Sequence, residues 1–504
     1  MTRPGVREVS RRKLVKSLAA GAGAFCFPWR AKAALGRPRL TIIVVAAQFR
    51  SDYLFRNLNV FNAGGFRRLI DESAFFPDCQ LHSTTFTSTG LATIATGSYP
   101  AIHGIVANRW YETGAHRLKV AEPSDIAVTT LFQQETDPAN RFFAIGATEA
   151  QAGLFKPGAA SGVFFRKPDS TFATLGNEPG WLSAFNQVHA AEKLQNKGWF
   201  AQGAGVGATP LRTLHYDAAK QENFKALLAS SPFAQSAEIQ LIRETIRAEN
   251  LGLNSSDTVV AVLDSLGRLG SETGAASPLI DDEVVSLDAD LAALLDWLDA
   301  RGQTYQIVFT AAHGAPTEPV ATYRLGPDEI IESVEKALAR EFAKDNRGIR
   351  FVEAYVYPFL YLRTNHLSHA DVPRARQIAG TAAVETGRVS GFVTADGYAS
   401  QFGEWGTRGR NSFYPGRSGD ILLAYRPGIV EYIGADRGIS YGSMWNYDAQ
   451  VPLLLKGPSF VPGRFDHSVE LTDVAPTLSA VAGLPPPAAS TGRVLAEAFG
   501  EGVA

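Results

Sequence analysis

The stretches "TVVAVLD" at Thr258–Asp264 and "YQIVFTA" at Tyr305–Ala311 decide the fold of this chain. Both runs are continuously apolar and rich in β-branched residues, which is typical of strands covered on both faces. The segment "DDEVVSLDADLAALLDWLDARG" (281–302) lies between them and has helical periodicity. Its apolar residues share one stripe, formed by Val284, Leu287, Leu291, Leu294 and Leu298. A strand, a helix and a strand in this order predict a right-handed parallel crossover.

Further apolar runs extend this pattern in both directions along the chain. They are "LTIIVVAA" (40–47), "FFAIGA" (142–147), "DILLAY" (420–425) and "VPLLL" (451–455). All the runs together predict an α/β domain over residues 38–500, with a mainly parallel sheet sandwiched by helices. The segments at about 155–235 and 315–415 interrupt the pattern, and we interpret them as cap segments inserted into this domain.

The composition is that of an ordinary globular protein rather than a disordered or fibrous one. Of the 504 residues, 45% are hydrophobic and 19% are charged. The net charge of -2 provides no electrostatic attraction to nucleic acid or to an anionic membrane, so neither is expected as a partner. After the N-terminal region, no segment reaches the roughly 20 apolar residues that cross a bilayer.

Residues 1–33 are predicted to be a twin-arginine export signal. Arg11 and Arg12 precede a mildly apolar stretch, which ends at the small-residue pattern "AKA" (31–33). Cleavage after this pattern would release a periplasmic protein. Cys79 is then its one remaining cysteine, so an intramolecular disulfide is excluded.

The segment "STTFTSTGLATIATGSYPAIHGI" (83–105) is expected to begin a helix near Thr87–Gly90. Hydroxyl groups and free backbone N–H groups at such a helix start favour an anion. The same residues would also serve as a threonine-rich helix cap, and taken alone that interpretation is the simpler one.

His313 directly follows a predicted strand, in "TAAHGA" (310–315). Ligands of open α/β sheets bind beyond the carboxyl ends of the strands, so this histidine stands where a metal would be held. A metal needs several protein ligands, and the neighbouring Ala311 and Ala312 provide none.

Motifs spread along the chain resemble those of the alkaline phosphatase superfamily. They are "TSTGLATIATGSYPAIHGIVANRWY", "TAAHGA", "GRSGDILLAYRPG", "YGSMWNYDAQVPLLLKGP" and "DVAPTLSAVAGLPPP". They are similar to those of the type I phosphodiesterase/nucleotide pyrophosphatase branch and of bacterial phosphatases with a threonine nucleophile. Because they keep the family's order from about Thr41 to Leu495, the resemblance implies an alkaline-phosphatase-like fold.

In that family, two zinc ions activate the nucleophile and bind the phosphoryl oxygens. The resemblance places the catalytic, ligand-binding nucleophile on Thr87 and the phosphoryl-binding asparagine on Asn108. Of the metal ligands it retains Asp264 and His313, as remnants with low expected occupancy. The other ligand positions hold different residue types: Ala47, Arg268, Ala312 and Tyr441. No resident cofactor is therefore expected.

The family's positive substrate clamp is also missing. "ATEAQAG" (147–153) stands where the phosphatase branch carries "KDR", and Leu91 stands where the family has a histidine. Arg268 follows Asp264 by four residues and is included among the ligand-binding residues. Pairing with Asp264 would put its guanidinium near a former zinc position, and an Arg268 that points into solvent is an equal alternative.

These losses favour a pseudoenzyme that binds phosphate, a phosphate ester or an unknown protein partner. Threonine is a poor nucleophile unless a metal or a base lowers its pKa. No motif position supplies that base, so negligible phosphatase activity is expected. The alternative is an active phosphomonoester or phosphodiester hydrolase that uses Thr87 with a rebuilt or single-metal site, drawing on His82, Asp52 or Glu272. A purely structural cell-envelope protein would bind no anion at Thr87.

Overall fold

The computed structural model describes eight ranges of the chain: 38–155, 162–316, 324–325, 327–343, 348–398, 403–433, 438–439 and 441–500. The predicted export signal lies outside these residues. Among the helices in these ranges, none combines the length and the apolar character that a bilayer-spanning segment requires.

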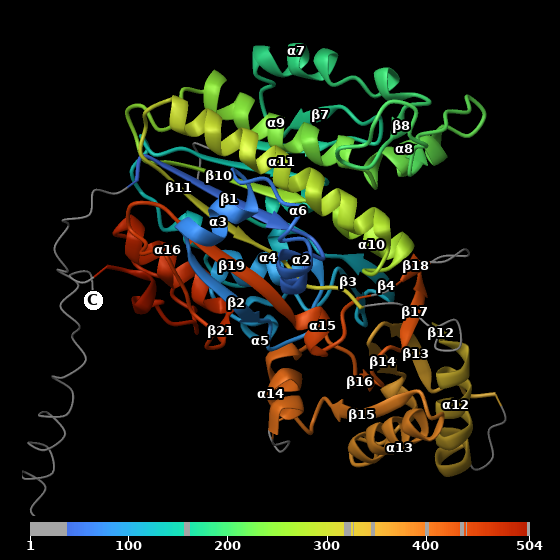
Figure 1. Ribbon diagram of the computed structural model, residues 1–504. Helices are drawn as coiled ribbons and strands as arrows, with labels where there is room; N and C mark the ends of the chain where they lie inside the picture. The colour runs from blue at the N-terminus through green and yellow to red at the C-terminus, as the bar shows by residue number, and fades with distance from the viewer. Residues whose placement is uncertain are drawn as a thin grey trace, which may run out of the picture.

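A ten-stranded sheet forms the middle layer of the main body (Figure 1). Its strands, from one edge to the other, are β20 (Gly463–Arg464), β2 (Ala74–Gln80), β19 (Gln450–Lys456), β11 (Tyr305–Thr310), β1 (Leu40–Ala46), β10 (Asp257–Leu263), β5 (Phe142–Gly146), β6 (Gly162–Arg166) and β7 (Phe172–Thr174), with β21 (Val469–Glu470) beside β2. The central block from β11 to β6 is parallel, whereas β19 runs antiparallel to both of its neighbours and β7 runs antiparallel to β6. The prediction of an α/β fold with a mainly parallel sheet is confirmed.

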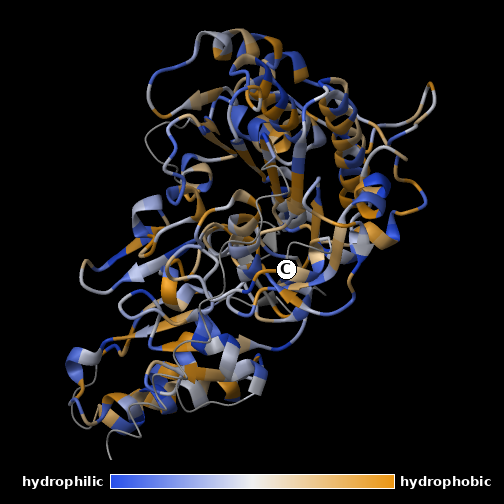
Figure 2. Ribbon diagram, turned by 90° about the vertical axis from the view of Figure 1, so that its left-hand side faces the viewer, coloured by the Kyte–Doolittle hydropathy of each residue, from blue (hydrophilic) through white to orange (hydrophobic). Residues whose placement is uncertain are grey.

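Helices cover this sheet on both faces. The crossover from β10 to β11 runs through α10 (Ser265–Thr273) and α11 (Pro278–Ala300), and α11 packs beside α9 (Pro232–Ala248). The predicted stripe of α11 is buried in the core, as expected. In Figure 1, α9 and α11 lie above the sheet, whereas α16 (Val474–Ala482) lies on its other side. Figure 2 shows apolar residues, in orange, on strands and helices in the interior of the main body.

The predicted strand at 420–425 is present but does not join the central sheet. It forms β16 (Ile421–Tyr425) in a separate sheet of order β13-β14-β16-β15, with β13 (Val352–Val356), β14 (Phe359–Leu362) and β15 (Val389–Thr394). Leu423 faces the core of this smaller unit, whereas Leu422 belongs to the main core. Its continuous apolarity therefore reflects burial between two cores.

The two segments interpreted as caps differ in structure. Helices α12 (Asp328–Phe342) and α13 (Val372–Glu385) cover the four-stranded sheet, at the lower right of Figure 1, and share a core with it. The earlier segment adds β6 and β7 to the central sheet and then forms α7 (Gly180–Val188) and α8 (Gln221–Ala229). It is therefore partly an extension of the main sheet.

Glu283 on α11 makes the stability of this fold dependent on pH. Its side chain is fully buried, and burial raises the pKa of its carboxyl to about 8. The native state then keeps a proton that the unfolded chain releases near pH 4.3, so stability falls as pH rises from about 4.3 to 8.

We expect Glu283→Gln to remove this dependence. Its stabilising effect over wild type should grow with pH between about 4.5 and 8, by at most about 1.4 kcal/mol per pH unit. Thermal unfolding at pH 5 and pH 8 measures the change. A Tm gain that is equal at both pH values would contradict the assignment.

Candidate functional site

β1, β10 and β11 are parallel neighbours, so their carboxyl ends lie side by side along one side of the sheet. We call this side the carboxyl edge of the sheet. The parallel register pairs Ala46 with Leu263, and Val45 with Thr310. The backbone N–H of Ala47 continues this ladder by donating to Leu263 O at 2.8 Å. The strand register thus brings the residues after each strand to the same edge.

Helix α4 (Thr87–Thr96) packs directly against this edge through Gly90. A Cβ at Gly90 would lie 1.9 Å from Ala312 O, so only glycine permits this approach. Phe86 is the N-cap residue of α4, and the Thr87 hydroxyl contacts the side chains of His313 and Tyr441. The structure therefore decides against the helix-cap interpretation of Thr87.

The Thr87 hydroxyl contacts His313 instead. Thr87 Oγ1 lies 3.0 Å from His313 Nε2, and His313 Nδ1 lies 2.7 Å from Gly314 O. A carbonyl oxygen can only accept, so Nδ1 carries the proton. Burial lowers the pKa of His313 to about 4, which leaves the imidazole neutral. Its Nε2 therefore accepts a hydrogen bond from Thr87.

Asn108 and Tyr441 complete what we call the Thr87 cluster: Thr87, Asn108, His313 and Tyr441. The Tyr441 hydroxyl lies 3.3 Å from Thr87 Oγ1 and accepts from Asn108 Nδ2 at 3.1 Å. Asn108 Oδ1 accepts from the backbone N–H of Ser88 at 2.9 Å, which fixes its amide. The Tyr441 ring stacks on His313, with 4.2 Å between centroids and an interplanar angle of 18°.

Arg268 pairs with Asp264 beside this cluster. Arg268 Nε lies 2.9 Å from Asp264 Oδ2, while its side chain stays 45% exposed. Burial raises the pKa of Asp264, and the Arg268 guanidinium opposes that shift. Both charges also act on the pKa of Tyr441, which burial raises. The structure thus brings together all five predicted site residues, and of the two alternatives for Arg268 it shows the ion pair.

The donors around Thr87 do not fit two zinc ions. Ala47 and Ala312 are buried methyl groups, Asp264 is held by Arg268, and both His313 nitrogens have partners. Each zinc site needs three or four ligands. Within the part of the chain that the structure describes, no group of three or more His, Cys, Asp or Glu side chains could hold a metal. We assign no catalytic step to zinc.

The side chains considered for a rebuilt site are occupied elsewhere. They are paired as His82–Glu470 at 3.0 Å, Asp52–Arg50 at 2.7 Å and Glu272–Arg212 at 2.8 Å. His313 is instead the neutral group whose unprotonated ring nitrogen contacts the Thr87 hydroxyl. From the sequence we interpreted His313 as a remnant metal ligand. The sequence signal for its contact with Thr87 was its position directly after the strand that became β11.

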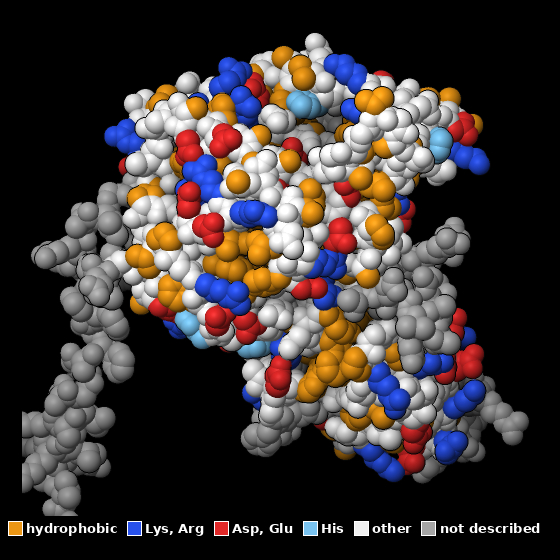
Figure 3. Space-filling model, in the orientation of Figure 1, with side chains coloured by type: hydrophobic (Ala, Val, Ile, Leu, Met, Phe, Trp, Pro, Cys, Tyr) orange, Lys and Arg blue, Asp and Glu red, His pale blue; other side chains and the backbone are white. Residues whose placement is uncertain are grey.

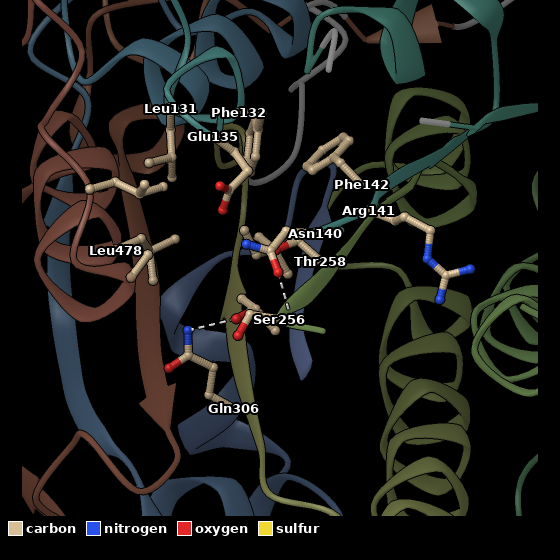
Figure 4. Close-up of a pocket in the computed structure, with 14 residues that line it drawn as sticks. Leu131, Phe132, Glu135, Asn140, Arg141, Phe142, Ser256, Thr258, Gln306 and Leu478 are labelled. Carbon is tan, nitrogen blue, oxygen red and sulfur yellow. Dashed lines mark hydrogen bonds between the residues drawn. The ribbon is translucent and has the colours of Figure 1, made fainter. Parts of the chain in front are cut away.

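A cavity of about 510 Å³ lies at the same edge of the sheet. Arg268, Arg166 and Thr148 are among its lining residues, so it lies beside the Arg268–Asp264 ion pair. A pocket of about 60 Å³ lies at the opposite end of these strands, lined by Thr258 and Gln306 near the starts of β10 and β11 (Figure 4). Of these two cavities, the larger one includes a predicted site residue, Arg268, in its lining.

Charges of both signs are interspersed on the face shown in Figure 3. This distribution agrees with the net charge of -2. The expectation that nucleic acid is not a partner stays a prediction.

Comparisons with known proteins cover nearly the whole chain. The family model described as type I phosphodiesterase / nucleotide pyrophosphatase matches residues 41–429. The chain is 25% identical to alkaline phosphatase PafA of Elizabethkingia meningoseptica, over 93% of this chain and 95% of that protein. It is 24% identical to alkaline phosphatase PhoV of Synechococcus elongatus, over 92% of this chain and 93% of that protein.

Solved structures show the same fold. The crystal structure of wild-type PafA has a TM-score of 0.82 at 21% identity, covering 93% of this chain and 100% of that chain. Murine ectonucleotide pyrophosphatase / phosphodiesterase 5 has a TM-score of 0.54 at 14% identity, covering 88% and 95%. The predicted alkaline-phosphatase-like fold is confirmed.

Proposed function

Because the chain belongs to the type I phosphodiesterase/nucleotide pyrophosphatase family of the alkaline phosphatase superfamily, we propose that it hydrolyses phosphate esters at the Thr87 cluster. Thr87 is the nucleophile and His313 its base. The contact between Thr87 Oγ1 and His313 Nε2, at 3.0 Å, carries this proposal. It favours the active alternative over the pseudoenzyme expected from the sequence, since that expectation rested on a missing base.

The proposed reaction has two steps. Thr87 Oγ1 attacks phosphorus while His313 Nε2 accepts its proton, and the bond from phosphorus to the ester oxygen breaks. The alcohol leaves with the proton held by His313 Nε2, which returns the imidazole to its neutral form. Water then attacks the phosphothreonine and gives a proton to His313, which passes it to Thr87 Oγ1 as the bond from phosphorus to that oxygen breaks and the phosphate product is released.

Neutral groups and one paired cation are available to hold the ester. Asn108 Nδ2 contacts the Tyr441 hydroxyl beside Thr87, and Thr87 is the first residue of α4, whose amino end contributes about 0.3–1 kcal/mol at an exposed site. Arg268 adds the nearest guanidinium, and the 510 Å³ cavity beside it has room for the organic part of the ester. Because the four cluster residues carry no cation and Arg268 is paired with Asp264, we expect turnover to be slow.

We expect that metal removal will not abolish this activity. Bis(4-nitrophenyl) phosphate and 4-nitrophenyl phosphate are the probes, with the purified protein assayed before and after dialysis against a chelator. The rate should change less than about twofold, because no step uses a metal. Activity that is lost on chelation and restored by zinc would show a metal site and contradict the proposal.

A second candidate function is binding of a phosphate ester without turnover. One observation favours it: the Tyr441 hydroxyl lies between Thr87 Oγ1 and Asn108 Nδ2, where a phosphoryl oxygen would lie. Calorimetry with inorganic phosphate that shows binding, combined with no hydrolysis of either probe, would assign this function.

A further inference from the structure

The Tyr441 side chain is held in the Thr87 cluster by two features of its surroundings. Its ring stacks on His313, and Gly442 beside it has φ 115°. A Cβ at Gly442 would lie 2.3 Å from Phe86 Cζ, so any residue with a side chain would clash at position 442.

The hydrogen bonds of the cluster run in one direction. Asn108 Nδ2 can only donate, so the Tyr441 oxygen accepts from it. The Thr87 proton is committed to His313 Nε2, so Thr87 Oγ1 is the acceptor in its contact with Tyr441. The Tyr441 O–H group is therefore the donor toward Thr87.

We propose that Tyr441 is a further catalytic residue, whose hydroxyl donates to Thr87 in the free protein and to a non-bridging phosphoryl oxygen of the bound ester. This inference rests on the proposed function. When Thr87 bonds to phosphorus, the phosphoryl oxygens come close to two donors: Tyr441 O–H, which contacts Thr87, and Asn108 Nδ2, which contacts Tyr441. The step transfers no proton from Tyr441.

Two observations support a donor role for this hydroxyl. Burial raises the pKa of Tyr441, so the phenol keeps its proton at neutral pH. The hydroxyl also contacts the two motif residues that the family resemblance assigns to phosphoryl chemistry. Donors aimed at developing charge in a buried site contribute about 10²–10³ in kcat.

Tyr441→Phe tests this inference because it keeps the ring that stacks on His313 and removes only the hydroxyl. We expect kcat for bis(4-nitrophenyl) phosphate to fall by about 10²-fold, with KM changed much less. Tyr447→Phe is the matched control, since its hydroxyl accepts from the backbone N–H of Gly428 outside the cluster. Its kcat should equal that of wild type, and unchanged Tm values would show that both variants fold.

The outcomes separate this inference from the proposed function. If Thr87→Ala is inactive while Tyr441→Phe keeps its kcat, the donor role is wrong and the proposed function stands. If wild type has no turnover, the proposed function fails, and phosphate affinity measured by calorimetry decides the role of Tyr441. Binding of inorganic phosphate about fivefold weaker in Tyr441→Phe supports a donor. Equal or tighter binding overturns it, and tighter binding identifies Tyr441 as an occupant of the anion site.

Discussion

Thr87→Ala is expected to lower kcat/KM for aryl phosphate esters by about 10⁴-fold, the largest loss we predict for a single substitution. The change deletes the nucleophile and leaves His313 without its hydrogen-bond donor. Initial rates with bis(4-nitrophenyl) phosphate measure the loss. Mass spectrometry of quenched wild-type reactions should locate a phosphoryl group on Thr87.

Thr87→Ser is the control for this experiment. It retains a hydroxyl at the same backbone position, 3.0 Å from His313 Nε2 in the wild-type geometry, and we expect at least a tenth of the wild-type rate. Because Thr87 is almost fully buried, the Tm of both variants should be compared with that of wild type. Wild-type rates in folded Thr87→Ala would place the nucleophile on another residue.

His313→Gln is expected to lower kcat by about 10²–10⁴-fold, the second-largest effect. The glutamine keeps a polar group behind Thr87 but cannot accept its proton, and general-base catalysis contributes this range of rate. The wild-type rate should fall as pH drops through about 4, because burial lowers the pKa of His313 to about 4 and protonation removes the base.

The same group predicts a stability change with the opposite sign to that of Glu283. Between about pH 4 and 6.5 the unfolded chain binds a proton at His313 that the native state does not, so stability rises with pH across this window. Thermal unfolding of His313→Gln should lack this contribution. A rate profile whose acidic limb is centred near 6.5 would show that a histidine other than His313 is the base.

The main fold could be predicted from the sequence because each of its signals is local. The continuous apolar sequences of β1, β10 and β11 indicate strands that are buried on both faces. The stripe of apolar residues on α11 indicates a helix between β10 and β11. The run of β16 shows the limit of such reasoning. Its apolarity measures burial but does not say against which core, and the tertiary structure placed it in the smaller sheet.

For the candidate site too, the sequence predicted which residues take part, whereas the tertiary structure showed how they contact one another. Motif positions alone identified Thr87, Asn108, Asp264, Arg268 and His313, because the order of the motifs survives where the ligands do not. The proposed role of His313 as a base rests on the parallel register, on the close approach at Gly90 and on the acceptor Gly314 O. Likewise, an i,i+4 spacing allows Arg268 either to pair with Asp264 or to face solvent. Contacts between distant segments decide such questions, since the distance and direction of a hydrogen bond are properties of packing rather than of sequence spacing.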